Sequence, residues 1–161
     1  MAVAEKALGE AGRRAKVEAI IAANQGKPGA LLPILRGIQR ELGYLAEADL
    51  LAVAQALGLP MSKVYGTATF YSLFALKPKG KYVIRVCESA PCHVEGFPEI
   101  LEAIKAELGI GLGETTPDWK FSLETTSCIG VCGVAPAIMI NDEVYGNLTP
   151  EAIPQILAQY K

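Results

Sequence analysis

Apolar residues in the first half of the chain recur at the spacing of an α-helix. Three stretches carry such an apolar face, at about residues 31–42, 50–57 and 64–71. The stop signals Gly43 and Gly58 follow the first two, and Ser62 can cap the third. Together with an amphipathic stretch before Gln25, they predict a small bundle of about four short helices.

The pattern changes near Lys77-Pro78-Lys79-Gly80. Beyond this point, strand-like alternation is interleaved with helical spacing. We therefore predict an α+β protein with two domains, an N-terminal helical bundle over residues 1–78 and an α/β domain over residues 79–161.

The second domain is predicted to follow the order β-α-β-β-α, with a further short strand added by a hairpin turn at Asn141-Asp142 before the last helix. Its elements are strands at 81–87, 119–124, 137–140 and 143–145, a helix at 97–108 and a helix from about 149 to 160. In the 119–124 strand, Trp119, Phe121 and Leu123 would face inward and the alternate residues would face water. Pro154 lacks an N–H donor, so a tight turn should precede the last helix. With a crossover after the first strand, this is thioredoxin-like order.

Composition excludes several classes of protein. The formal charge is −2, with 51% apolar and 20% charged residues, so there is no basic field for nucleic acid. No apolar run approaches the roughly 18 residues of a membrane span, and the N-terminus lacks the features of a secretion signal. We expect a cytoplasmic chain with reduced thiols that buries part of its surface against partners.

All four cysteines fall into two close pairs, Cys87-x4-Cys92 and Cys128-x3-Cys132. The first pair follows the first predicted strand, and the second pair lies in the loop between the second and third strands. If these strands are neighbours, both loops emerge at the same end of the sheet, and four thiolates can surround one centre. Gly130 and Gly133 suit a tight backbone bend that leaves N–H groups free to point at sulfur.

The cysteine spacing discriminates among metal sites. A Rieske centre needs two histidines, and His93 is the only one. Plant-type C-x4-C-x2-C and bacterial C-x2-C-x2-C spacings are absent, whereas a [2Fe–2S] cluster takes two thiolates on each iron. Zinc stays open as an alternative, although its sites commonly use C-x2-C. A disulfide framework is disfavoured by the cytoplasmic location, and a dithiol oxidoreductase by the lack of C-x-x-C.

The residues around the cysteines resemble the signature of one family. They are Cys87-Glu-Ser-Ala-Pro-Cys92-His-Val-Glu-Gly96, Cys128-Ile-Gly-Val-Cys132-Gly-Val-Ala-Pro136, the 64–74 segment and Leu148-Thr-Pro-Glu151. They are similar to the thioredoxin-like [2Fe–2S] subunit of NADH dehydrogenase modules. This family includes the small subunit of respiratory complex I and the gamma subunit of NADH-linked [FeFe]-hydrogenases. The resemblance extends over about residues 31–157.

This resemblance implies a ligand set and a role. Cys87 and Cys92 would bind one iron of a single [2Fe–2S] cluster, and Cys128 and Cys132 the other. The chain would exchange single electrons with a partner subunit that holds FMN, NAD(H) and [4Fe–4S] clusters, and it would have no catalytic residue or substrate site of its own. The helical bundle would dock the cluster domain onto that flavin subunit.

The resemblance leaves the parent complex open. The amino-acid sequence of the Cys87–Cys92 motif and the short chain favour an NADH-dependent hydrogenase, including the electron-bifurcating kind. NADH:quinone oxidoreductase and NAD-linked formate dehydrogenase use a similar subunit, and a zinc-stabilised structural adaptor is the alternative from another class.

Three aromatic residues near the end of the predicted bundle can be interpreted in two ways. Phe70, Tyr71 and Phe74 could face a partner or belong to the core, because both arrangements produce the same spacing. His93 is expected to pack near the metal centre as a loop side chain. Arg13 and Arg14 are expected to lie on a solvated helix face.

Overall fold

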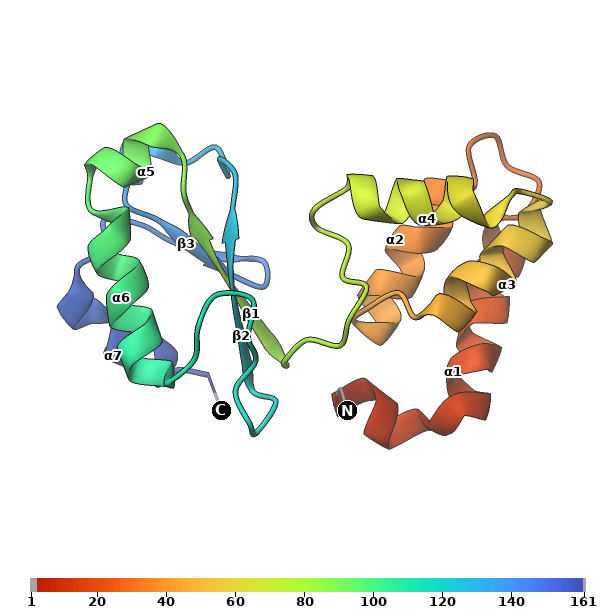
Figure 1. Ribbon diagram of the computed structural model, residues 1–161, viewed down its shortest axis with the longest axis horizontal. Helices are drawn as coiled ribbons and strands as arrows, with labels where there is room; N and C mark the ends of the chain where they lie inside the picture. Colours follow the sequence, from red (N-terminus) through yellow and green to blue (C-terminus); the bar gives the residue numbers. More distant parts are fainter. Residues whose placement is uncertain (1–2, 161) are drawn as a thin grey trace. The chain divides into compact units, whose positions relative to one another are not determined.

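The protein is described by a computed structural model over residues 3–160. The chain forms two compact units that meet between Lys79 and Gly80 (Figure 1). We call the part before this boundary the helical unit and the part after it the cysteine unit. Helices alone build the first and a mixed sheet with helices builds the second, which confirms the predicted fold class.

The helical unit consists of α1 (Val3–Asn24), α2 (Leu31–Leu42), α3 (Glu47–Leu57) and α4 (Met61–Phe70). The apolar face predicted for α2 is buried except at its first residue: Ile34, Leu35, Ile38 and Leu42 are all at most 1% exposed, whereas Leu31 is partly buried. Helices α1 and α2 approach closely, since a Cβ added at Gly37 would lie 2.8 Å from the Ile20 side chain. Burial of these apolar faces holds the bundle together.

Helix ends in this unit follow the predicted signals with one exception. Gly43 and Gly58 take the left-handed conformation after α2 and α3, as expected of C-terminal glycines. The exception is α4, whose N-cap is Pro60 and not Ser62. The helix begins one residue before Ser62, which places that side chain inside the first turn.

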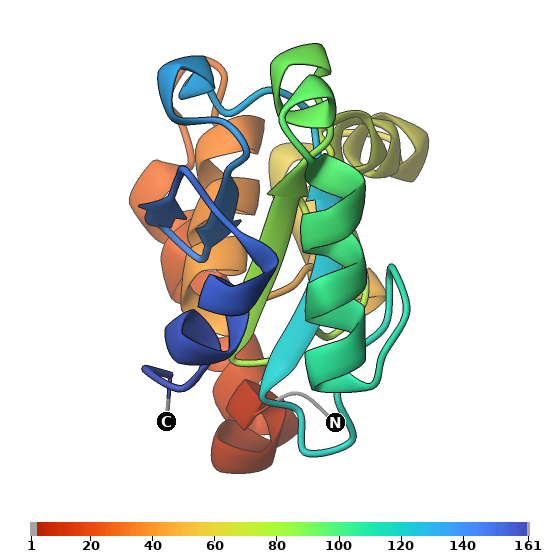
Figure 2. The same cartoon turned by 90° about the vertical axis from the view of Figure 1, so that its left-hand side faces the viewer.

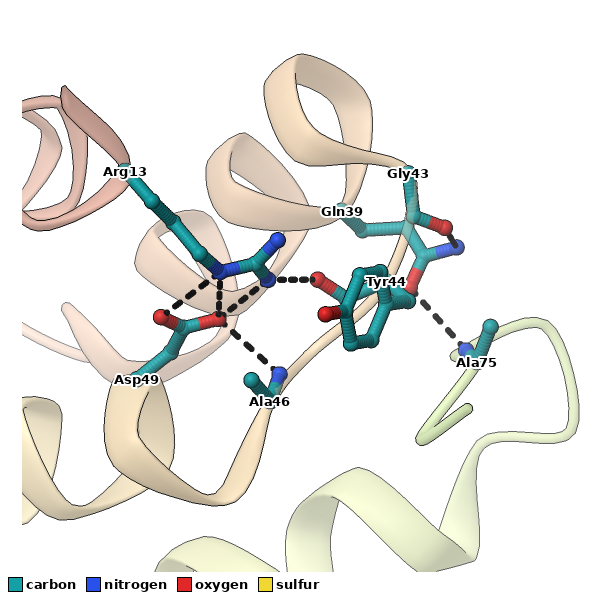
Figure 3. Close-up of polar contacts among 7 residues, drawn as sticks. All are labelled: Arg13, Gln39, Gly43, Tyr44, Ala46, Asp49 and Ala75. Carbon is teal, nitrogen blue, oxygen red and sulfur yellow. Dashed lines mark hydrogen bonds and ion pairs between the residues drawn. The ribbon is translucent and has the colours of Figure 1, made fainter. Parts of the chain in front are cut away.

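A buried ion pair ties α1 to the start of α3 (Figure 3). Arg13 Nη2 lies 2.5 Å from Asp49 Oδ2, and the two side chains are 11% and 5% exposed. The same guanidinium donates to the Tyr44 carbonyl at 2.8 Å and lies over the Tyr44 ring at 4.2 Å. The expectation of a solvated Arg13 is therefore wrong, whereas Arg14 is 81% exposed as predicted.

Gln39 extends this network to the end of the helical unit. Its side-chain amide donates to the Gly43 carbonyl at 3.0 Å, and its oxygen accepts the Ala75 N–H at 3.0 Å (Figure 3). The Leu45 N–H then donates to the Ala75 carbonyl at 2.8 Å. The turn after α2 is thereby hydrogen-bonded to the segment that leads out of the unit.

The cysteine unit contains a four-stranded sheet in the order β2-β1-β3-β4. Its elements are β1 (Tyr82–Cys87), α5 (Ala90–Val94), α6 (Phe97–Leu108), β2 (Phe121–Thr126), the 3-10 turn η1 (Cys132–Val134), β3 (Ile138–Ile140), β4 (Glu143–Tyr145), the 3-10 turn η2 (Pro150–Ala152) and α7 (Ile153–Leu157). β1 pairs in parallel with β2 and antiparallel with β3. The parallel pair is joined by the predicted crossover through α6.

The core of this unit lies between one face of the sheet and helices α6 and α7, which are both on that side (Figure 2). Ile84, Leu123, Ile138 and Ile140 from the sheet and Ile104 and Ile153 from the helices are fully buried. Pro154 fits as predicted, because η2 precedes it and α7 begins at Ile153. The helix then ends at Leu157, earlier than expected.

The strand predicted from Trp119 begins later than the alternation indicates. Trp119 has φ 60° and lies outside β2, which starts at Phe121. A tight turn causes this, because Asp118 accepts the Lys120 N–H at 3.0 Å and Trp119 N–H donates to the Thr116 carbonyl at 2.8 Å. None of the helices within residues 3–160 is long and apolar enough to cross a membrane.

Candidate metal centre

The two cysteine loops emerge at the same end of the sheet, as the sequence predicts. β1 and β2 run parallel in register, so that Cys87 at the end of β1 lies beside Thr126 at the end of β2. The chain after β1 turns into α5, which carries Cys92, and the chain after β2 forms the loop with Cys128 and Cys132 (Figure 1). Parallel pairing thus places both loops at one end of the sheet.

The two pairs differ in burial. Cys87 is 3% exposed and Cys92 is 1% exposed, and both pack with Ala137. We call them the inner pair. Cys128 and Cys132 are exposed, and we call them the outer pair. All four are free thiols, so the site combines a dry side with a side that is open at the surface.

The outer pair has the spacing of two ligands on one metal ion. The Sγ atoms of Cys128 and Cys132 are 3.7 Å apart. Two sulfurs bound to a tetrahedral metal at about 2.3 Å each would be separated by about 3.8 Å. Gly130, with φ 83°, bends the loop and directs its N–H at Cys128 Sγ from 3.4 Å. This is the role predicted for Gly130, whereas Gly133, for which the same role is predicted, does not take a positive φ.

The inner pair is surrounded by groups that favour anionic sulfur. Burial by itself raises the pKa of Cys87. Hydrogen bonds from the backbone N–H of Ser89, the Cys92 thiol and the backbone N–H of Ile129 outweigh burial, and the pKa lies below the ordinary value. Burial and the hydrogen bond with the Cys87 side chain raise the pKa of Cys92. The hydrogen bond from the Ala137 N–H acts in the opposite direction but is outweighed. The thiolate is the form that binds metal.

In the outer pair, the interactions between the two cysteines shift the pKa of Cys132. The hydrogen bond with Cys128, followed by the nearby negative charge of that group, raises the pKa of Cys132. Cations bound at such a site displace thiol protons, because the ligand is the thiolate.

The thiols come as two pairs and not as one tetrahedral set. Within residues 3–160, no three His, Cys, Asp or Glu side chains converge closely enough to hold a single metal ion. A binuclear cluster needs only two protein thiolates on each iron, because sulfide supplies the rest of the coordination. The donor set therefore fits a [2Fe–2S] cluster.

His93 lies within the short helix α5 and not in the loop expected from the sequence. Its ring lies 5.7 Å from the Phe97 ring, centroid to centroid, and its side chain is exposed. Its backbone N–H donates to the Ser89 carbonyl at 2.9 Å within the short α5 helix. The imidazole therefore packs on Phe97 at the start of α6.

The structure separates the aromatic residues whose role the sequence leaves open. Phe70 is 79% and Tyr71 42% exposed, whereas Phe74 packs against the bundle core. Tyr65 and Leu73 are also exposed, at 50% and 56%. We call Tyr65, Phe70, Tyr71 and Leu73 the aromatic edge. The sequence does not single out Tyr65 and Leu73, because helical spacing alone does not distinguish an exposed face from a buried one.

A mixed sheet whose parallel strands carry two thiol pairs at one end is the arrangement of a thioredoxin-like iron–sulfur protein. The chain belongs to the thioredoxin-like [2Fe–2S] ferredoxin family, whose sequence pattern it matches over residues 17–161. This assignment confirms the predicted cofactor, one [2Fe–2S] cluster.

Known proteins similar to this chain come from two kinds of complex. The NADP-reducing hydrogenase subunit HndA of Solidesulfovibrio fructosivorans is 41% identical over 134 residues, which cover 83% of this chain and 78% of HndA. One of the subunits of the NADH-quinone oxidoreductase of Escherichia coli (strain K12) is 41% identical over 132 residues, covering 82% and 80% of the two chains.

A solved structure supports the same grouping. The fold matches a chain of an NAD+-reducing [NiFe]-hydrogenase in the H2-reduced state with a TM-score of 0.70 and 25% identity. The match covers 81% of this chain and 22% of the hydrogenase chain. This protein therefore spans about a fifth of that larger chain.

Proposed function

We propose that this protein is the [2Fe–2S] electron-transfer subunit of a multisubunit NADH-linked oxidoreductase, with Cys87, Cys92, Cys128 and Cys132 as the cluster ligands. The observation that carries the proposal is the parallel pairing of β1 and β2, which brings both thiol pairs to one end of the sheet. Family membership and relatives in two NAD(P)H-linked complexes support it.

Each pair of cysteines holds one iron in this proposal. The 3.7 Å separation of the outer sulfurs suits two ligands of one tetrahedral ion. Cys87 and Cys92 share a hydrogen bond and are nearly inaccessible to water. When bound, the cluster supplies one-electron chemistry. The residues of this chain hold it, exclude water from its inner side and direct N–H groups at the ligand sulfurs.

The difference in burial assigns a direction to electron exchange. The inner pair packs with Ala137, with Phe97 of α6 and with apolar residues of the 129–135 loop, whereas the outer pair is exposed. The partner that delivers or removes the electron therefore approaches the outer pair. We assign FMN, NAD(H) and [4Fe–4S] clusters to partner subunits, because the chain has no glycine-rich dinucleotide motif, and we expect no substrate site here.

The parent complex that we propose is an NADH-linked hydrogenase in the cytoplasm. The amino-acid sequence of the Cys87–Cys92 motif and the similarity to HndA support a hydrogenase. Reduced thiols fit the cytoplasm. The Escherichia coli relative, at the same 41% identity, supports NADH:quinone oxidoreductase as the second candidate. Purification of the native complex separates them: a hydrogenase catalytic subunit should accompany this chain, and membrane-embedded quinone-reducing subunits would contradict the proposal.

The test of the proposed function is metal analysis with EPR. Anaerobically purified protein should contain about two iron and two acid-labile sulfide ions per chain, and reduction by dithionite should produce the signal of one unpaired electron. A colourless protein with one zinc and no such signal would establish the structural adaptor instead.

The aromatic edge is the surface by which we expect the helical unit to dock. Phe70→Ser should leave folding unchanged, since the ring is 79% exposed. It should weaken binding to the flavin subunit by about 30-fold or more, because exposed aromatic residues are frequent interface hot spots.

Leu51→Ser is the matched control for Phe70→Ser, because Leu51 is also an exposed apolar residue of the helical unit, at 48%, and lies on α3. Titration of each variant with the purified flavin subunit provides the measurement. Equal affinities for the two variants would place the docking surface elsewhere.

A further inference from the structure

The 3-10 turn η1, which begins at Cys132, packs directly against Gly146. A Cβ added at Gly146 would lie 2.5 Å from Val134 Cγ2 and 2.7 Å from the Val134 carbonyl oxygen. Val134 ends η1, which begins at Cys132, and Gly146 follows β4. Because one of the obstructing atoms belongs to the backbone, rotation of a side chain cannot make room. Only glycine fits here without moving the turn.

Hydrogen bonds hold the same contact. The Asn147 N–H donates to the Val134 carbonyl at 2.6 Å, and the Leu148 N–H donates to the Pro136 carbonyl at 3.2 Å. Asn147 has φ 51°, a conformation that asparagine adopts more readily than most residues. The chain after β4 is therefore shaped to bind the far side of the outer cysteine loop.

Residues 134–137, which these hydrogen bonds hold, also contact the inner pair. The last of these residues, Ala137, accepts a hydrogen bond from the Cys87 N–H at 3.2 Å and packs with both Cys87 and Cys92. Residues 134–137 therefore lie between the chain after β4 and the inner cysteines. A displacement at Val134 changes where the outer pair lies relative to the inner pair.

We propose that Gly146 and Asn147 are positioning residues for the [2Fe–2S] cluster, fixing the outer cysteine pair relative to the inner pair through Val134. Both residues act through the loop, by their contacts with Val134. This inference rests on the proposed function. A purely structural role at the edge of the sheet would alter stability without changing the properties of the cluster, so the two roles are distinguishable.

The experiment compares Gly146→Ala with two controls in the cluster-loaded full chain. Gly66→Ala adds a Cβ where nothing lies within 4 Å, and Val144→Ala truncates an exposed side chain of the same hairpin. Gly146→Ala should lose iron to a chelator about tenfold faster than wild type, as for other groups that orient metal ligands, and its EPR g-values should shift. Both controls should match wild type.

A second measurement keeps the inference testable if Gly146→Ala does not fold. Hydrogen–deuterium exchange of peptides that span Asn147 should be slow in the cluster-loaded wild type and faster after the cluster is removed. Exchange that does not respond to the cluster, or a folded Gly146→Ala protein with wild-type iron loss and EPR, would overturn the inference. A wild type without a [2Fe–2S] signal would instead overturn the proposed function, and the inference with it.

Discussion

Cys92→Ser is expected to abolish the [2Fe–2S] cluster, whereas Cys128→Ser should retain a weakened one. Cys92 is 1% exposed and packs with Cys87 and Ala137, so no water can replace the lost thiolate, and the buried hydroxyl adds a desolvation cost. Cys128 is exposed, which leaves water or the serine oxygen free to complete the coordination. Iron and sulfide content, visible absorption and EPR measure the difference.

Ser127→Ala is the control, because it changes an exposed side chain beside Cys128 without removing a sulfur. It should load and reduce like wild type. The far-UV circular dichroism of all three variants should stay close to that of wild type, because the longest helix and most helical residues lie in the helical unit. Full cluster occupancy in Cys92→Ser would contradict the ligand assignment.

Features that depend on local sequence could be predicted from the chain. The buried face of α2 follows from helical spacing, and its end at Gly43 follows from a glycine that adopts φ 81°. The strand that ends at Cys87 follows from alternation. Two thiol pairs at one end of the sheet follow once β1 and β2 are parallel neighbours, since register then fixes where both loops emerge.

Features that depend on distant partners could not be predicted. Arg13 has the sequence surroundings of an exposed helical arginine, and its burial is explained by Asp49, 36 residues away, together with Tyr44. Gly146 looks like an ordinary residue after a strand until Val134 is known to lie against it. Trp119 continues an apparent alternation, yet the turn at Asp118 removes it from the strand. In each case a long-range contact or turn geometry outweighs local periodicity.

Asp49→Ala is expected to destabilise the helical unit by about 3 kcal/mol or more, because it removes one partner of a buried ion pair. Arg13 loses a carboxylate at 2.5 Å while remaining 11% exposed. The Ala46 N–H at the start of α3 also loses the Asp49 oxygen that accepts its hydrogen bond at 2.9 Å. Asp49→Asn keeps an acceptor for Ala46 but no charge, so its effect should be intermediate.

Two controls isolate the buried pair from surface charge. Glu47→Ala removes an exposed carboxylate from the same turn of α3 and should change stability by about 0.5 kcal/mol or less. Arg14→Ala breaks the exposed pair with Glu18, in which the two side chains are 81% and 59% exposed, and should cost less than about 1 kcal/mol. Chemical denaturation followed by circular dichroism at the helical band measures all four variants in the full chain.

The single tryptophan provides an internal reference for this experiment. Trp119 lies in the cysteine unit, whereas the Arg13–Asp49 pair and most helical residues lie in the helical unit. Asp49→Ala should therefore shift the helical transition by more than the tryptophan fluorescence transition. An Asp49→Ala midpoint equal to that of Glu47→Ala would show that the ion pair contributes nothing to stability. In that case Tyr44, whose ring and carbonyl both contact Arg13, would hold α1 in place without the carboxylate.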